Sequence, residues 1–331
     1  MQLLKVIDKK EIMRISVVIA TYNGIEFIEE QLNSIKNQTR QADEVLIRDD
    51  GSTDGTCEFL KKYIEDNKLL SWTLNLNEEN LGYRRNFIQL LKDSSGDVIF
   101  LSDQDDIWNP VKLHEMTNEM EKNKDIYLLS SDYTPFSNSN LSHSVPGYKG
   151  VRKGNTDWID YRAKNAGVLR PGHGYAIRRE LLPYAFRFFD YDKAVSHDAA
   201  LQFTSGLLGK MYNYPYSMDD YRLWSGSSSS QESKKRQNSN LSPKEASALI
   251  FFNDMLKRYD SAISFCEDYR SEIRNYDYFY RNLPKSKERF VNVIKFIKGR
   301  NSFSRFKYLP RIGLSYSVYL VKNFVISKYR N

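Results

Sequence analysis

The sequence predicts an α/β fold in which a mostly parallel sheet is followed by a helical region near the carboxyl terminus. Apolar runs alternate with helically spaced apolar residues over the first 130 residues, and polar clusters follow three of these runs directly. The last third of the chain shows helical spacing. Strands that alternate with helices over short connections are typical of right-handed crossovers and a parallel sheet.

Two strand–helix units open the chain. The nearly continuous apolar run Ile15–Ala20 is typical of a strand buried on both faces, and the turn cluster Thr21–Gly24 ends it. Apolar residues between Phe27 and Ile35 then recur at helical spacing. A second predicted strand, Glu44–Arg48, leads into the polar stretch Asp49–Thr56, which opens the next helix.

Two further strands are predicted at Trp72–Leu74 and Val98–Leu101. The second ends in the segment LSDQDDIW, where Asp103, Asp105 and Asp106 fall within four positions. Because ligands of a parallel sheet bind at the carboxyl ends of its strands, the polar clusters that follow the strands should form one site. The other two clusters contribute Thr21, Tyr22, Asn23, Asp49 and Asp50.

The rest of the chain is predicted to hold loops, a linker and helices. Residues 134–160 are rich in Ser, Asn, Gly and Pro, which indicates a long surface excursion. Ser242-Pro243-Lys244-Glu245 forms a capping box, and apolar residues recur at helical spacing behind it. We therefore predict an α/β domain over 1–226, a polar linker or mobile loop over 227–241, and a helical region over 242–331.

Composition limits the compartment of the protein. The two cysteines, Cys57 and Cys266, lie far apart without metal-ligand spacing, which suggests a reducing compartment without disulfides. The first fourteen residues mix charges into their apolar positions, so we expect no secretory signal peptide. No window of eighteen residues is both apolar and uncharged, so we expect no membrane-spanning helix. These features predict a cytoplasmic protein, soluble or peripheral on the inner face of the cell membrane.

The positive charge of the chain is concentrated in its tail. Residues 281–331 hold thirteen Lys and Arg against one acid, which gives +12, while the other 280 residues carry −5 of the net +7. An acidic body without a basic-aromatic motif argues against a partner that is RNA or DNA. The apolar stripe from Phe290 to Ile297 beside basic residues favours an amphipathic helix on an anionic membrane surface. A helix that packs on the core with a solvated basic face is the alternative.

The acidic segment after Leu101 admits several interpretations. Carboxylates at a strand end can cap the next helix or stay solvated, and an isolated Asp-x-Asp is more often of this kind. A calcium loop would need a central Gly and a terminal Glu, which are absent. The remaining interpretation is a divalent cation that joins the carboxylates to substrate phosphates. The neighbouring clusters favour it, since Asp49 or Asp50 can accept hydrogen bonds from a base or ribose and Thr21–Asn23 can line the base.

Four linked segments carry a resemblance to a known family. They are VVIATYNG, IRDDGSTDGT, NLGYRRNF and LSDQDDIW, in this order and spacing. Together they resemble glycosyltransferase family two, with its GT-A nucleotide-sugar fold, over roughly residues 13–225. The form SDQDDIW resembles the bacterial rhamnosyltransferase branch. The resemblance implies that Asp105 binds Mg²⁺ or Mn²⁺, that Asp103 faces the ribose or reaches the metal through water, and that Asp106 and Arg84 contact the substrate.

The same resemblance implies a base that takes the proton of the acceptor hydroxyl. This base falls at Asp198, because Ser196–Leu201 opens a helical segment after a polar break. His197 is the alternative base, since an unperturbed histidine has a pKa near neutrality. The structural alternative for Asp198 is an acid that interacts with the helix dipole. His173, between two glycines, is either an acceptor contact or a loop histidine.

One position departs from the family pattern. Related enzymes often carry a Tyr-Arg pair followed two residues later by a His that completes the metal shell, and this chain has Tyr221-Arg222-Leu223-Trp224. An indole N–H cannot ligate a cation, so Asp105, phosphates and waters would hold the metal. Arg222 is a candidate contact of the diphosphate, with a surface ion pair as the alternative.

The residues and the resemblance together predict an inverting, metal-dependent glycosyltransferase. Its donor is expected to be dTDP-L-rhamnose, and its acceptor a hydroxyl of a lipid-linked glycan in bacterial cell-surface polysaccharide biosynthesis. One alternative is a transferase that uses UDP-glucose, UDP-galactose or UDP-GlcNAc. The other is a catalytically weak scaffold of a polysaccharide assembly complex. The tail is expected to meet an anionic membrane surface.

Overall fold

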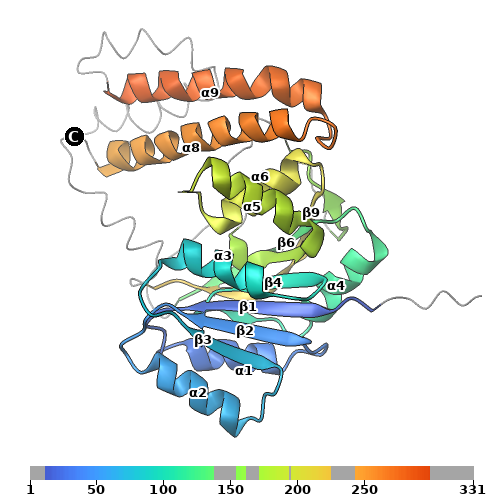
Figure 1. Cartoon of the computed structure of the whole chain (residues 1–331), viewed down its shortest axis with the longest axis vertical. Helices are drawn as coiled ribbons and strands as arrows, with labels where there is room; N and C mark the ends of the chain where they lie inside the picture. Colours follow the sequence, from blue (N-terminus) through green and yellow to red (C-terminus); the bar gives the residue numbers. More distant parts are fainter. Residues whose placement is uncertain (1–11, 138–153, 162–170, 194, 225–242, 299–331) are drawn as a thin grey trace, which may run out of the picture.

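The computed structural model describes residues 12–137, 154–161, 171–193, 195–224 and 243–298 (Figure 1). The strands are β1 Ile15–Thr21, β2 Glu44–Asp49, β3 Trp72–Leu76, β4 Val98–Ser102, β5 Ile107–Trp108, β6 Leu128–Phe136, β7 Asp157–Trp158, β8 Tyr175–Arg178 and β9 Met211–Arg222. The α-helices are α1 Ile28–Lys36, α2 Thr56–Asp66, α3 Tyr83–Asp93, α4 Lys112–Lys122, α5 Leu182–Tyr191, α6 His197–Leu207, α8 Pro243–Asp268 and α9 Tyr276–Lys298. Two short 3₁₀ turns, η2 Gly172–Gly174 and η3 Arg179–Leu181, flank β8.

The described strands form one nine-stranded sheet in the order β3-β2-β1-β4-β8-β6-β9-β5, with β7 paired to β9. Strands β3, β2, β1 and β4 are parallel. Strand β8 runs antiparallel between β4 and β6, and β6 and β9 are parallel to each other. The strand–helix alternation of the sequence therefore produced the parallel half, whereas the second half is mixed.

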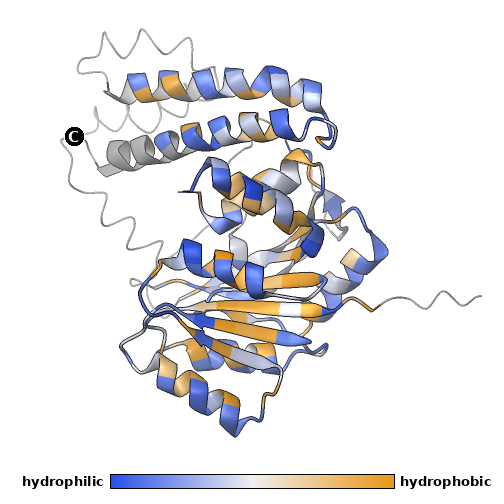
Figure 2. Ribbon diagram, in the orientation of Figure 1, coloured by the Kyte–Doolittle hydropathy of each residue, from blue (hydrophilic) through white to orange (hydrophobic). Residues whose placement is uncertain are grey.

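Alternation along β1 explains how both faces of the sheet are covered. Val17 and Ile19 pack in the core that includes α1, while Val18 packs in a second core that includes Phe87 of α3. All three β1 side chains are fully buried, and each such burial contributes about 1.5–3 kcal/mol. Figure 2 shows the resulting apolar strands between polar outer helix faces. The sheet is thereby a rigid base for the loops at its carboxyl edge.

Helices α8 and α9 lie against each other and over α5 and α6 (Figure 1). Phe265 of α8 lies 5.9 Å from Phe188 of α5 between ring centroids. Leu283 and Ile294 of α9 are buried in the same core. Of the predicted apolar stripe, Ile294 therefore packs on the core, which agrees with the core-packing alternative at that position. Residues 299–331 lie outside the described residues.

Two other sequence predictions meet the structure in part. The expected surface excursion over 134–160 is wrong at its ends, because β6 extends to Phe136 and β7 pairs with β9. The linker predicted over 227–241 and the cap residue Ser242 lie outside the described residues, while α8 begins at Pro243. None of the described helices is long and apolar enough to cross a membrane.

Candidate functional site

The carboxyl ends of β1, β2 and β4 lie side by side, as the parallel register requires. Gln104, in the loop after β4, holds the loop after β1: its Oε1 accepts from the Tyr22 N–H at 2.8 Å and its Nε2 donates to the Tyr22 carbonyl at 3.0 Å. A Cβ atom added at Gly24 would lie 2.4 Å from Gln104 Oε1, so a larger residue there would displace the Gln104 amide from its bonds to Tyr22. The three predicted polar clusters are therefore brought together at one edge.

Asp49 organises the loop after β2. It is fully buried, and its two oxygens accept hydrogen bonds from the Thr21 hydroxyl, the Gly51 N–H, the Ser52 N–H and hydroxyl, and the Cys57 thiol. A carboxylate offers about four lone-pair sites. These bonds fill the usual acceptor capacity of the carboxylate and favour a structural role, while the predicted contact of Asp49 with a base or ribose stays a prediction.

Asp50 binds the next loop in the same manner but less completely. It accepts from the Asn77 amide and from the Leu81 and Gly82 N–H groups at 2.8 Å each. One lone-pair site remains, although the side chain is only 2% exposed. Its predicted contact with the base or ribose stays a prediction.

The three residues after β1 differ in accessibility. Thr21 is buried and donates to Asp49. Asn23 has φ +48°, and its Oδ1 accepts from the Thr53 N–H at 2.9 Å. Tyr22 is 49% exposed. Of the three, Tyr22 therefore presents the surface on which a nucleobase can stack.

The acidic loop, which we define as Asp103–Asp106, is poorly supplied with hydrogen-bond donors. The carboxylate of Asp103 accepts none from the described residues. Asp105 Oδ2 accepts from the Trp224 indole N–H at 2.5 Å. Asp106 is fully buried; its Oδ1 accepts from the Arg222 N–H at 3.0 Å, and its Oδ2 has no hydrogen-bond partner in the described part of the chain.

The protonation of this loop reflects its crowding. Burial raises the pKa of Asp103 to about 6. The charges of Asp105 and Asp198 also raise this pKa, and the charge of His173 lowers it. Burial also raises the pKa of Asp105, against the hydrogen bond from Trp224. Burial raises the pKa of Asp106 well above its usual range, and the neighbouring carboxylates add to the shift. A bound cation would relieve this penalty.

His173 is an interior residue, which removes the loop-histidine alternative. Its Nδ1 lies 2.9 Å from Asp219 Oδ2 and 3.7 Å from Asp106 Oδ2, and its ring stacks on Tyr221 at 4.9 Å. Burial opposes a charge on the ring, but Asp219 and Asp106 outweigh it and raise the pKa of His173 to about 9. The two carboxylates therefore favour the imidazolium form of the ring.

Helix α6 begins at His197, as predicted. Asp198, in its first turn, accepts from the Ala199 N–H at 2.8 Å, and its charge raises the pKa of Asp103. His197 stacks on Phe87 at 4.0 Å. Burial lowers the pKa of His197 to about 4, against the charge of Asp198, so this ring is neutral and a poor proton acceptor near pH 7.

Two neighbours complete this corner of the site. Gly172 approaches α6 so closely that an added Cβ atom would lie 3.1 Å from His197 Nε2 and 3.2 Å from Asp198 Cβ. Arg84, in the first turn of α3, is half-buried, and its charge acts on His197. Arg84 therefore lies at the margin where the resemblance places a substrate contact.

Arg222 is hydrogen-bonded to the acidic loop. Its Nε donates to the Asp105 carbonyl at 2.8 Å, and a second guanidinium nitrogen lies 2.6 Å from Glu30 Oε2. The guanidinium lies 4.6 Å from the ring centroids of both Phe27 and Phe136. The alternative of a surface ion pair is met in part, because Arg222 is buried while the Glu30 side chain is 56% exposed. The predicted contact with a diphosphate stays a prediction.

The donor set fits a divalent cation held jointly with a substrate. Mg²⁺ characteristically uses one or two carboxylates together with phosphate oxygens and waters. Asp105 keeps Oδ1 for such a cation, because Trp224 bonds to Oδ2. Within the described residues, no three His, Cys, Asp or Glu side chains form a complete metal-ligand group. Phosphate oxygens and waters would have to complete the shell.

Two residues of the site, Lys112 and Asp219, escaped the sequence reasoning. Both are buried and form an ion pair of 2.8 Å across 107 positions. A lysine at the start of a helix opposes the helix dipole, and an acid inside a strand is unfavourable. Both positions therefore carried a weak signal of a special role.

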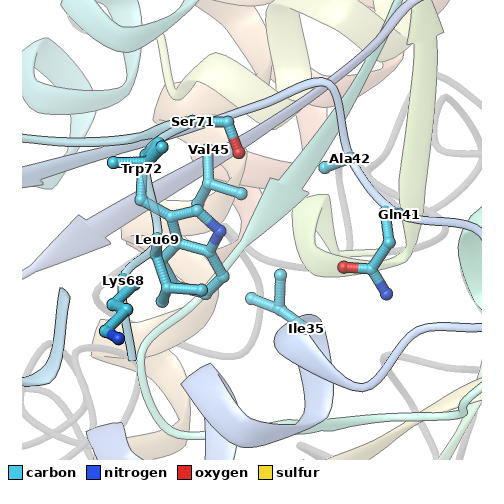
Figure 3. A pocket seen from close by; sticks show the side chains of 9 residues that line it. Ile35, Gln41, Ala42, Val45, Lys68, Leu69, Ser71 and Trp72 are labelled. Atoms are coloured by element: carbon cyan, nitrogen blue, oxygen red, sulfur yellow. The ribbon is translucent and has the colours of Figure 1, made fainter. Parts of the chain in front are cut away.

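A cavity of about 370 Å³ lies away from the acidic loop, near the amino-terminal ends of β2 and β3 (Figure 3). Its wall includes Ile35, Val45, Leu69 and Trp72, and none of the predicted site residues lines it. The polar edge of the sheet, rather than this cavity, contains the predicted site residues.

Sequence comparison identifies a known family over about half of the chain. The family model for Glycosyl transferase family 2 matches residues 16–182, about half of the chain. An uncharacterized glycosyltransferase of Nostoc sp. is 24% identical over 214 residues, which cover 64% of this chain and 65% of the relative. The dTDP-rhamnosyl transferase RfbG of Shigella flexneri is 30% identical over 188 residues, which cover 55% of this chain and 61% of the relative. The match thus spans less than two thirds of these relatives.

Structure comparison agrees on the fold. The mannosyltransferase PcManGT from Pyrobaculum calidifontis, solved with GDP-Man and Mn²⁺, superposes with a TM-score of 0.58 at 16% identity. The superposition covers 97% of this chain and 82% of that protein. The predicted GT-A fold is thereby confirmed.

Proposed function

Since this chain belongs to glycosyl transferase family 2, we propose that it transfers a sugar from a nucleotide sugar to a hydroxyl group of an acceptor. The observation that carries the proposal is the acidic loop at the carboxyl edge of the sheet, with Asp103 unbonded and Asp198 within electrostatic range. Asp105 and Asp103 would hold Mg²⁺ or Mn²⁺ together with the donor diphosphate. Tyr22 and Asp50 would receive the nucleoside, with Arg84 at the margin of the site.

Asp198 is proposed as the base of the reaction. Its carboxylate accepts the proton of the acceptor hydroxyl while the acceptor oxygen forms a bond to the anomeric carbon. The bond from that carbon to the diphosphate oxygen breaks, and the electron pair leaves with the nucleotide, so that attack from the opposite face inverts the centre. A cation held at Asp105 would supply neutralising charge for the departing diphosphate.

The proposed donor is dTDP-L-rhamnose. The support is the 30% identity to a relative named as a dTDP-rhamnosyl transferase, together with the SDQDDIW form. UDP-glucose, UDP-galactose and UDP-GlcNAc are the competing donors. Ligands that bind the native state raise its melting temperature by mass action. A thermal-shift panel of these four donors, with and without Mn²⁺, should single out one donor that requires metal.

A transfer assay separates the enzyme from the scaffold alternative. With the donor selected by the thermal-shift panel, the enzyme should release free nucleoside diphosphate in a metal-dependent manner when a glycan acceptor is added. A catalytically weak scaffold would bind the donor and release none. The absence of both binding and release for all four donors would contradict the proposed function.

The proposed acceptor is a lipid-linked glycan, reached from the inner face of the membrane through the tail. Residues 299–331 hold seven Lys and Arg and no acid, and each basic residue near an anionic surface contributes about 1 kcal/mol. Their removal leaves the buried Ile294 of α9 in place. The shortened chain should fold, retain activity on a soluble acceptor and lose binding to anionic liposomes. Liposome binding equal to that of the full chain would contradict the membrane role.

A further inference from the structure

A set of buried charges lies behind the acidic loop, and the proposed reaction does not use it. Lys112 is fully buried at the start of α4. Its ammonium group donates to Asp219 Oδ2 at 2.8 Å and to the His173 carbonyl at 2.7 Å, and it lies 4.2 Å from the Trp108 ring centroid. Lysine is almost never fully buried unless it is paired. These contacts hold the Lys112 side chain in the interior, where it is paired with Asp219.

Asp219 joins Lys112 to a second interior cation. The same Oδ2 atom that accepts from Lys112 lies 2.9 Å from His173 Nδ1. Burial would raise the pKa of Asp219, but Lys112 and His173 hold it below its usual range. Two cations thus share one carboxylate, and the set carries a net positive charge of one.

This positive charge faces the acidic loop. His173 Nδ1 lies 3.7 Å from Asp106 Oδ2, and the charge of His173 acts on Asp103 and Asp105. A fixed positive charge near carboxylates repels a second cation and attracts an anion, with an energy that grows as the local dielectric falls. Buried charges cost free energy of folding. An arrangement of charges that joins α4, η2 and β9 is therefore expected to have a role other than stability.

We propose that Lys112, Asp219 and His173 form a built-in counter-charge, which weakens the binding of a divalent cation alone and makes it bind together with a nucleoside diphosphate. The inference rests on the proposed function, in which both ligands meet at the acidic loop. The negative charge of the diphosphate offsets the repulsion between the counter-charge and the divalent cation. The site then stays largely metal-free until the donor arrives.

The variant His173→Asn tests this inference. Asparagine places an N–H near the position of Nδ1 and can still donate to Asp219, but it carries no charge. Titration calorimetry should find Mn²⁺ alone bound about tenfold more tightly and UDP or dTDP without metal bound about tenfold more weakly. A merely structural role for His173 predicts that both ligands weaken. Opposite signs for the two ligands therefore support the counter-charge, while equal signs or unchanged affinities overturn it.

Two further variants separate this test from the proposed function. His197→Asn replaces a buried histidine that is already neutral, so it should leave the affinity for Mn²⁺ alone unchanged. Asp105→Asn should abolish Mn²⁺ binding with or without nucleotide. If Asp105→Asn keeps Mn²⁺ binding, the proposed metal site fails; if only His173→Asn behaves as the parent, the counter-charge fails while the metal site stands.

A measurement on the unaltered protein covers the case in which His173→Asn does not fold. The ring nitrogens of His173 in ¹⁵N-labelled protein should both show the shifts of protonated nitrogen at pH 7 without metal. A neutral ring at that pH would overturn the counter-charge without recourse to any variant.

Discussion

Two acidic loops follow buried strands of the same sheet, and they are built in opposite ways. After β2, Asp49 accepts five hydrogen bonds and Asp50 accepts three. After β4, Asp103 accepts none from the described residues and Asp105 accepts one. The chain thus satisfies its carboxylates at the first loop and leaves them deficient at the second.

The difference teaches what to look for in a cluster of acids. Carboxylates that accept backbone N–H groups fix the shape of a loop and are stable as anions. Carboxylates that are buried without donors carry an electrostatic penalty, which a ligand of opposite charge can remove. Number of donors, rather than number of acids, therefore separates a scaffold loop from a binding loop.

Asp105→Asn should give the largest effect, and it tests the deficient loop. Loss of one charged ligand should lower turnover by about a thousandfold or more, which corresponds to about 4 kcal/mol of transition-state stabilisation. Because Asp105 makes one side-chain hydrogen bond, the melting temperature should hardly change. Transfer assays and calorimetric melting check the two halves of this prediction, and full activity with metal present would remove Asp105 from the metal site.

Asp49→Asn should show the reverse pattern. The amide would face the Gly51 and Ser52 N–H groups with a donor in place of an oxygen, and buried groups that lose a charged partner cost about 1–3 kcal/mol each. We expect a loss of about 3 kcal/mol in the free energy of unfolding, measured by urea denaturation. A variant that is as stable as the parent but fails to bind nucleotide would instead support Asp49 as a base or ribose contact.

The hydrogen bonds of the loop after β2 could not be predicted from the sequence. The apolar runs of β1, β2 and β4 predicted the strands, and their parallel order predicted that the clusters converge. The donors to Asp49 come from a loop whose path depends on Gly51 at φ +83° and on packing against Thr21. No periodicity reports such a path, so Asp49 looked like a free ligand.

The interior charges were missed for a related reason. Lys112 and Asp219 meet only because β5 pairs with β9, which brings Trp108 opposite Asp219. Sequence patterns predicted neither of these strands, and a pair separated by 107 positions leaves no local trace. The acidic loop itself was predictable, but the positive charge that makes it tolerable was not.

Asp198→Asn extends the comparison to an acid on a helix. Asp198 accepts one hydrogen bond within its own first turn and has its charge directed toward the deficient loop. Loss of a general base commonly lowers turnover by about a hundredfold, and donor affinity should stay nearly unchanged. Initial rates and donor titrations measure the two quantities separately. Weaker donor binding at full turnover would make Asp198 a binding residue, and His197→Gln would then be the next variant to assay.

Trp224→Phe should give the smallest effect, and it removes the one hydrogen-bond donor to the Asp105 side chain among the described residues. Phenylalanine keeps an aromatic ring for the edge contact with Phe27, now 5.0 Å between centroids, and removes the indole N–H. Without that donor, Asp105 can rotate and is charged less readily, because burial then acts on its pKa unopposed by Trp224. Affinity for Mn²⁺ in the presence of UDP should fall about tenfold, equivalent to about 1.4 kcal/mol and within the usual range for a hydrogen bond to a charged group.

Trp158→Phe is the matched control for this last change. Trp158 also donates its indole N–H, to the Gly209 carbonyl at 3.0 Å. It pairs with Tyr212 at the start of β9, whereas Trp224 follows the end of that strand. Its replacement should leave Mn²⁺ affinity unchanged while removing a hydrogen bond of the same kind. Equal losses for the two variants would mean that the sheet transmits a general disturbance. A loss confined to Trp224→Phe would mean that a single hydrogen-bond donor is enough to orient the Asp105 carboxylate for its cation. This would explain why Asp105 accepts more hydrogen bonds than Asp103 but fewer than Asp49.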